Sequence, residues 1–136
     1  MPIELNPYLT DEILSNSKLD KDPIIVYLIV RESLNMGAGK IAAQVGHGIQ
    51  MLMATYYDAG CKNSEIIQQW IKSAYRKVVL RADDKQFERI KQELDCFLVI
   101  DAGLTQISSG SETVICLWPQ RKSCVSKLIS RLQLLK

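Results

Sequence analysis

One uninterrupted apolar segment, residues 23–30, limits what this chain can fold into. The segment is rich in β-branched residues, starts at a proline and is followed by the charged pair Arg31 and Glu32. Such a run is typical of a strand that is buried on both faces, because a strand with one face in water alternates apolar and polar residues. The segment therefore predicts a central strand of a sheet that is covered on both sides.

A glycine-rich turn follows this strand and leads into a helix. Gly37 and Gly39 permit a tight turn, and Lys40 stands in the first helical turn. The free N–H groups and the dipole of a helix start favour an anion, and the ammonium adds a full charge. The turn lacks the first glycine and the hydroxyl of a Walker A loop, but it fits the G-x-G-x-x-A fingerprint. The acidic residue that a dinucleotide site needs after a second strand is lacking, so a nucleotide-binding enzyme is a minor alternative.

The rest of the chain predicts a three-layer α/β/α sandwich around a mixed four-stranded sheet. The first two strands should be parallel, because a long helical connection joins them, and the last two antiparallel, because only a short reversal separates them. The expected strands are residues 23–30, 76–81, 96–100 and 113–118, and the expected helices are 40–57, 65–73, one after Asp83 or Asp84, and a terminal one after Pro119. We expect residues 1–22 to be a partly ordered N-terminal lead-in and residues 23–136 to be the functional domain.

Size and composition indicate one globular domain. With 136 residues, the chain can bury a core but cannot form two domains. No apolar stretch reaches the roughly 18 residues of a membrane span, and the N-terminus has no signal core. The four cysteines show neither C-x-x-C pairing nor the spacing of metal ligands. We therefore expect a cytoplasmic protein with no membrane association and no metal site.

The net charge of +2 conceals an asymmetry along the chain. Residues 1–22 contain five acidic and two basic side chains, so they carry −3 and the remainder carries +5. A mildly basic domain permits a nucleic-acid partner without requiring one.

Two polar segments should meet beyond the carboxyl ends of the strands, where open α/β sheets bind ligands. One is the turn with Lys40, and the other is residues 101–105, which follow the third expected strand. If those strands are neighbours, Lys40 and Asp101 come close together, and the aspartate stays ionised and can orient a water or a hydroxyl. The structural alternative is that Asp101 only forms a turn and that Lys40 is only a solvated side chain.

The helix after the glycine turn should carry a polar stripe that the core does not use. Lys40, Gln44 and His47 share one face at helical spacing, apart from the apolar face. Gly46 and Gly48 flank His47, weaken the helix and leave room for a close approach. His47 alone fits a packing or hydrogen-bonding role as well as a binding role.

In combination, these residues resemble a known family. Residues 36–47 read M-G-A-G-K-I-A-A-Q-V-G-H, and residues 101–107 read D-A-G-L-T-Q-I. They are similar to the type 2 peptidyl-tRNA hydrolase family, whose patterns are close to M-G-K-G-K-I-A-A-Q-x-A-H and D-A-G-R-T-Q-I. The order of strands from about residue 23 to residue 136 is also similar.

The resemblance implies an enzyme that hydrolyses the ester between a peptide and the terminal ribose of tRNA, without metal or organic cofactor. Lys40, Asp101 and Thr105 match the family's catalytic lysine, aspartate and threonine. We expect Asp101 to hold the attacking water, Lys40 to stabilise oxyanion charge, and Thr105 to hold the water or the ester oxygen. The expected substrate-binding residues are Gly37, Gly39, Gln44, His47, Gly103, Gln106 and Arg31.

Two departures from the family pattern support an alternative. Ala38 and Leu104 stand where the family has a lysine and an arginine, and the loss of two cations should weaken tRNA binding and flatten its salt dependence. A non-catalytic RNA- or partner-binding module on the same fold is therefore the second hypothesis. The expected partner is peptidyl-tRNA, and a homodimer through the terminal helix or a sheet edge is compatible with the sequence.

Overall fold

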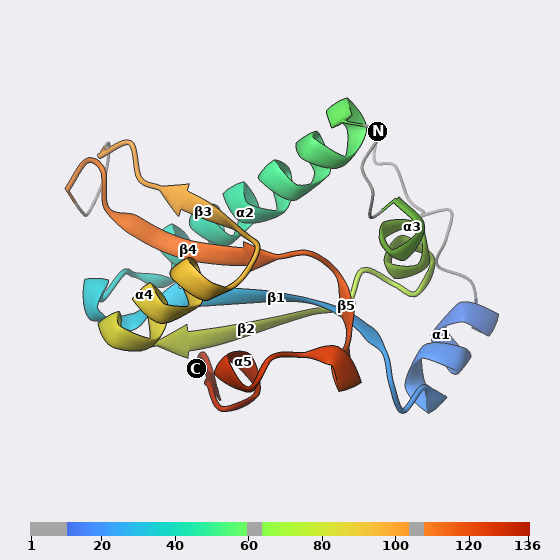
Figure 1. Ribbon diagram of the computed structural model, residues 1–136. Coiled ribbons are helices and arrows are strands. Elements are labelled where there is room, and N and C mark those ends of the chain that lie inside the picture. Colours follow the sequence, from blue (N-terminus) through green and yellow to red (C-terminus); the bar gives the residue numbers. More distant parts are fainter. Residues whose placement is uncertain (1–10, 60–63, 104–107) are drawn as a thin grey trace.

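A mixed sheet of six strands lies at the centre of the protein (Figure 1). The structure is a computed structural model, and it describes residues 11–59, 64–103 and 108–136. The strand order is β3-β4-β1-β2-β6, and β5 pairs with the start of β1. Strands β1 and β2 are parallel, whereas β4 is antiparallel to both of its neighbours. The strands are β1 (Ile24–Arg31), β2 (Lys77–Ala82), β3 (Cys96–Ile100), β4 (Glu112–Leu117), β5 (Gln120–Arg121) and β6 (Gln133–Leu134).

Helices cover both faces of this sheet and give the three layers that the sequence predicts. The helices are α1 (Asp11–Leu19), α2 (Ala38–Ala59), α3 (Ser64–Lys72), α4 (Asp84–Glu93) and α5 (Lys127–Ser130), with 3₁₀ turns η1 (Glu32–Leu34) and η2 (Lys122–Cys124). Apolar residues of α2 and α3 form one core, and those of α4 and α5 form the other. None of the helices described has the length and apolar character needed to cross a membrane.

Strand β1 is the central element, and its first seven residues are all buried. Alternate side chains enter the two cores: Leu28 packs in the same core as Trp70 of α3, and Ile29 in the same core as Phe87 of α4. This confirms the prediction that the apolar run is buried on both faces. The predicted parallel and antiparallel pairings are confirmed as well.

The C-terminal segment differs from the expected terminal helix. Helix α5 contains only four residues and lies between its N-cap Ser126 and its C-cap Arg131. The chain then extends and pairs with β2, where the Leu135 N–H donates to the Val79 carbonyl at 3.0 Å. Pairing satisfies backbone groups on the edge of β2, and a longer helix would leave them exposed. Strand β6 arises in this way, and together with β5, which pairs with the start of β1, it enlarges the expected four-stranded sheet to six strands.

Strands β1 and β3 are not neighbours, because β4 lies between them. Lys40 and Asp101 nevertheless meet, since α2 packs across β4 and β3 as well as β1. The sequence analysis expected Lys40 and Asp101 to come close because their strands are neighbours. That expectation is wrong, although β1 and β3 do end at the same edge of the sheet.

Gly48 marks the closest approach of α2 to the sheet. A Cβ atom at this position would lie 3.0 Å from Cys116 Cβ and 3.4 Å from Leu28 Cδ2, whereas one at Gly46 would meet nothing within 4 Å. The close approach that the sequence predicts beside His47 is thus made by the sheet, at Gly48.

These two glycines form a matched pair for a stability test. We expect Gly48→Ala to lower the free energy of unfolding by about 1 kcal/mol, because overpacking outweighs the gain in helix propensity. Gly46→Ala should raise it by up to about 1 kcal/mol, because only the propensity term acts. Urea unfolding of both variants measures the difference, and equal stabilisation by both would contradict the packing role of Gly48.

Candidate active site

A buried ion pair joins the start of α2 to the end of β3. Lys40 Nζ donates to Asp101 Oδ1, and the two side chains are only 8% and 2% exposed. Lys40 lies in the first turn of α2, directly after the glycine turn, and Asp101 follows the last residue of β3. The structure therefore brings together the two residues on which the predicted site depends.

The backbone around Asp101 forms a tight turn that fixes its carboxylate. The Asp101 N–H donates to the Ser111 carbonyl, and the Gly110 N–H donates to the Asp101 carbonyl, both at 2.8 Å. The Gly103 N–H donates to Asp101 Oδ2 at 2.7 Å. Gly103 adopts φ +78°, a left-handed conformation that glycine tolerates best. Gly103 is therefore part of the turn that aims the carboxylate.

Gln44 is buried beside the ion pair, which corrects the prediction that its stripe lies outside the core. Its side chain Nε2 lies 3.4 Å from Asp101 Oδ1, and its Oε1 accepts from Thr113 Oγ1 at 2.6 Å. Gln44 is 3% exposed and Thr113 is fully buried. Lys40 and Gln44 are covered because α2 packs over the ends of β3 and β4, where polar groups from three elements satisfy one another, whereas His47 on the same stripe stays exposed.

Thr113 is a site residue that the sequence analysis missed. Its hydroxyl also lies 3.3 Å from the Val99 carbonyl. By donating to Gln44 Oε1, Thr113 leaves the Gln44 amide nitrogen to face Asp101. The only sequence signal is a threonine at the start of a strand that is otherwise apolar, and such a residue is common in any sheet.

Asp101 is held in its ionised form. The pKa of its carboxyl lies below the ordinary value of 3.8, first because Lys40 donates to it. Burial acts in the opposite direction, whereas the Gly103 N–H and the charges of Lys40 and His47 lower the pKa further. A carboxylate of this kind is a strong hydrogen-bond acceptor, and Lys40 keeps further N–H donors for a second anionic oxygen.

Some of the other predicted site residues lie near the ion pair, and others lie elsewhere in the structure. Gly37, Gly39 and His47 are exposed near the start of α2, and the charge of His47 acts on Asp101. Arg31 lies on the opposite face of the sheet, where its Nε donates to Asp84 at 2.9 Å and its guanidinium lies over the Phe87 ring. The structure does not bring Arg31 to the ion pair. Thr105, Gln106 and Leu104 lie outside the described residues.

The described part of the chain contains no group of three or more histidine, cysteine, aspartate or glutamate side chains that could hold a metal ion. Among the described residues, the polar side chains at the ion pair supply one ammonium, one carboxylate, one amide and one hydroxyl. Together they can orient a water molecule beside a cation that stabilises negative charge.

Comparison with known proteins places these residues in a family. Residues 24–135 match the family model "Peptidyl-tRNA hydrolase PTH2". The chain belongs to this family. It therefore has the enzymatic function of the family, the hydrolysis of the ester bond of peptidyl-tRNA, with peptidyl-tRNA as its substrate.

Similar proteins from archaea and animals support this assignment. A peptidyl-tRNA hydrolase of Pyrobaculum aerophilum is 36% identical over 80% of this chain and 95% of its own length. That of Methanocaldococcus jannaschii is 30% identical over 79% of this chain and 96% of its own length. The human protein named "Peptidyl-tRNA hydrolase 2, mitochondrial" is 34% identical over 79% of this chain and 62% of its own length. Each of the three is named as a hydrolase, which favours the enzyme over the non-catalytic module.

Proposed function

We propose that Lys40, Asp101 and Thr105 carry out the hydrolysis of peptidyl-tRNA in this PTH2 enzyme. The observation that supports the proposal is the buried Lys40–Asp101 pair at the edge of the sheet where β1 and β3 end. Such a pair is costly to desolvate, so a site that needs a fixed charge is a better explanation for it than stability alone.

In the proposed mechanism, a water molecule adds to the ester carbonyl that links the peptide to the terminal ribose. The carbon–oxygen bond to the ribose then breaks, the peptide leaves with a carboxyl group, and the ribose oxygen takes a proton. Asp101 accepts a hydrogen bond from the water and orients it, and the ammonium of Lys40 stabilises the charge that develops on the carbonyl oxygen. Thr105 holds the water or the ester oxygen.

The remaining proposed residues bind the substrate around this centre. Gly37 and Gly39 are exposed at the start of α2, where the positive end of the helix dipole favours an anion. His47 stands on the same stripe as Lys40, and Gln44 fixes the carboxylate. Gly103 shapes the turn, and Gln106 follows Thr105 in the family motif. We leave Arg31 out of the proposed site, because Asp84 already neutralises its charge on the other face of the sheet.

The direct test measures the release of tRNA from N-blocked aminoacyl-tRNA. We expect the wild-type protein to turn over many substrate molecules, whereas release in buffer alone stays slow. Release no faster than in buffer, by a protein that still binds tRNA, would support the non-catalytic module and contradict the proposal.

The depressed pKa of Asp101 predicts how the rate depends on pH. Because the folded-state pKa lies below 3.8, the carboxylate and its ion pair are fully present above that pH and are lost as the pH falls below it. We therefore expect titration of Asp101 to reduce neither kcat nor stability between pH 8 and pH 5. Kinetics from pH 4 to pH 8, with circular dichroism as a check on folding, measure this.

An acid limb of activity between pH 5 and pH 7 would need another titrating group. The control is His47→Asn, which removes the single histidine of the sequence. A limb that persists in this variant would contradict the role assigned to Asp101.

Two further expectations accompany the proposed function. A cytoplasmic location suits an enzyme that acts on peptidyl-tRNA. A homodimer would use a sheet edge, and β3 is one of the two end strands of the sheet order, with Ile100 59% exposed. Analytical ultracentrifugation measures whether two copies associate.

A further inference from the structure

Three basic side chains at or just after the ends of the parallel strands are already paired with carboxylates. Lys40 is paired with Asp101, and Arg31 with Asp84. Arg81, near the end of β2, pairs with Glu32 at 3.1 Å. Ala38, in the first turn of α2, adds no charge. These positions therefore offer little net positive charge to the phosphates of a tRNA, so other residues must supply it.

The C-terminal segment, which we define as residues 113–136, has the charge that these positions lack. It contains five basic residues and no acidic residue. Among the described residues, no carboxylate forms an ion pair with its lysines or arginines. All five basic side chains are exposed, and they are Arg121, Lys122, Lys127, Arg131 and Lys136.

This segment runs along the sheet from one end of the strands to the other. Strand β5 pairs with Ile24 and Ile25 at the start of β1, and β6 pairs with Leu80 and Arg81 near the end of β2. Figure 1 shows η2, α5 and the C-terminus following this path beside β1 and β2. An eight-residue strand is roughly 26 Å long, so the segment spans several phosphate spacings of a nucleic acid.

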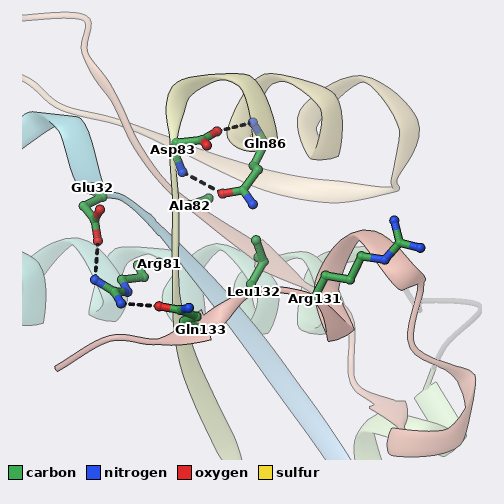
Figure 2. Close-up of a pocket in the computed structure, with 8 residues that line it drawn as sticks. All are labelled: Glu32, Arg81, Ala82, Asp83, Gln86, Arg131, Leu132 and Gln133. Carbon is green, nitrogen blue, oxygen red and sulfur yellow. Dashed lines mark hydrogen bonds and ion pairs between the residues drawn. The ribbon is translucent and has the colours of Figure 1, made fainter.

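At the end of this path, residues of the segment and of α4 line a pocket of about 260 Å³ (Figure 2). Arg81 is bound there to Glu32 and Gln133. The start of α4 carries the carboxylates of Asp83 and Asp84, and its capping box occupies the N–H groups of Asp83 and Gln86, so this helix start does not favour an anion. Arg131 instead extends away from these groups. Among the residues that line this pocket, Arg131 is therefore the basic side chain without an ion pair.

The carboxylate of Asp22, which lies near the start of the segment, is also engaged in hydrogen bonds within the protein. Asp22 accepts from the Ser123 N–H and from Ser123 Oγ, both at 2.8 Å. The guanidinium of Arg121 donates to the Asp22 carbonyl at 3.2 Å. Arg121 thus has a structural contact, whereas the side chains of Lys122, Lys127 and Arg131 remain for a ligand.

We propose that Lys122, Lys127 and Arg131 form a phosphate-binding track that holds the body of the tRNA, at a distance from the ester. The inference rests on the proposed function only for the identity of its ligand. Phosphate contacts set affinity and its salt dependence without taking part in bond cleavage. The track therefore acts on the binding of long substrates and leaves the chemical step unchanged.

The test uses the full-length triple variant Lys122→Gln, Lys127→Gln and Arg131→Gln. We expect the KM for N-blocked aminoacyl-tRNA to rise roughly tenfold, with kcat within twofold of the wild type. The slope of log Kd for deacylated tRNA against log salt should fall by about 2 to 3. Kinetics on an N-blocked aminoacyl ester of a short 3′-terminal oligonucleotide should be unchanged, because this substrate is too short to reach the track.

The matched control is Lys72→Gln, an exposed lysine on α3, which packs on the same face of the sheet as α2, whereas α5 packs on the opposite face. It should leave both KM and the salt slope unchanged. A triple variant that behaves like this control would overturn the proposal, and so would an equal loss on the short and long substrates. Wild-type binding to vesicles with anionic lipid, with unchanged tRNA binding in the triple variant, would assign the segment to membranes instead and also overturn it. If the wild type binds tRNA through the track but hydrolyses neither substrate, the proposed function fails and the track stands.

Discussion

Replacing Asp101 by asparagine is expected to lower kcat for peptidyl-tRNA hydrolysis by roughly 10³-fold. Asparagine keeps the shape of the side chain but loses the charge that orients the water. The change also leaves the ammonium of Lys40, whose side chain is only 8% exposed, without a counter-charge. We therefore expect the variant to be less stable as well as inactive. Single-turnover kinetics measure the chemical step, and thermal unfolding measures the stability.

A double variant separates catalysis from stability. Lys40→Met combined with Asp101→Asn removes both charges, so no uncompensated charge stays buried. The double variant should be more stable than the single Asp101 variant, since replacing both partners of a buried pair is often neutral. Its kcat should stay as low as that of Asp101→Asn. Recovery of activity together with stability would show that the ion pair only holds α2 against the sheet.

The second large effect is expected at Gly103. An alanine Cβ at this position would lie 2.5 Å from Ser109 Cβ and 2.6 Å from Ser109 Cα, and φ is +78°. Backbone strain and overpacking together should cost about 3 kcal/mol. Because the Gly103 N–H also fixes Asp101 Oδ2, we expect kcat to fall even at temperatures where the variant stays folded. Urea unfolding and tRNA release measure the two effects.

Gly110 provides the matched control for Gly103. It also has a positive φ, +86°, but a Cβ there would meet nothing within 4 Å. Gly110→Ala should therefore cost only about 1 kcal/mol, from backbone strain, and its activity should remain close to that of the wild type. Equal losses at the two positions would show that the close contact between Gly103 and Ser109 does not hold the turn.

The elements with strong local patterns were predictable from the sequence. The run of β-branched residues placed β1 at the centre, and the 3.6-residue spacing of apolar residues placed α2 within two residues of its observed ends. The strand β3 was predicted with its observed bounds. In each of these elements, the spacing of the apolar residues matches the face that is buried, so the local sequence was sufficient to predict the element.

What the sequence could not predict depends on tertiary pairing. The chain after α5 leaves the helix because β2 offers an edge, and no property of residues 131–136 alone indicates this. The burial of Gln44 follows from the path of α2 over β4, which hydrophobic spacing on one helix does not reveal. The proximity of Lys40 and Asp101 was predicted through neighbouring strands, and it arises instead because α2 crosses the strand between them.

The position of β4 between β1 and β3 also affects how activity develops as the chain folds. Lys40 and Asp101 both precede β4 in the sequence, yet β4 is the strand that joins their two halves of the sheet. A chain that ends before residue 112 would contain both charged groups without the support that holds them together. Non-local pairing of this kind is a slow step of folding. In refolding experiments, hydrolysis should therefore return only with the last sheet-forming phase, which makes it a direct measure of completed folding.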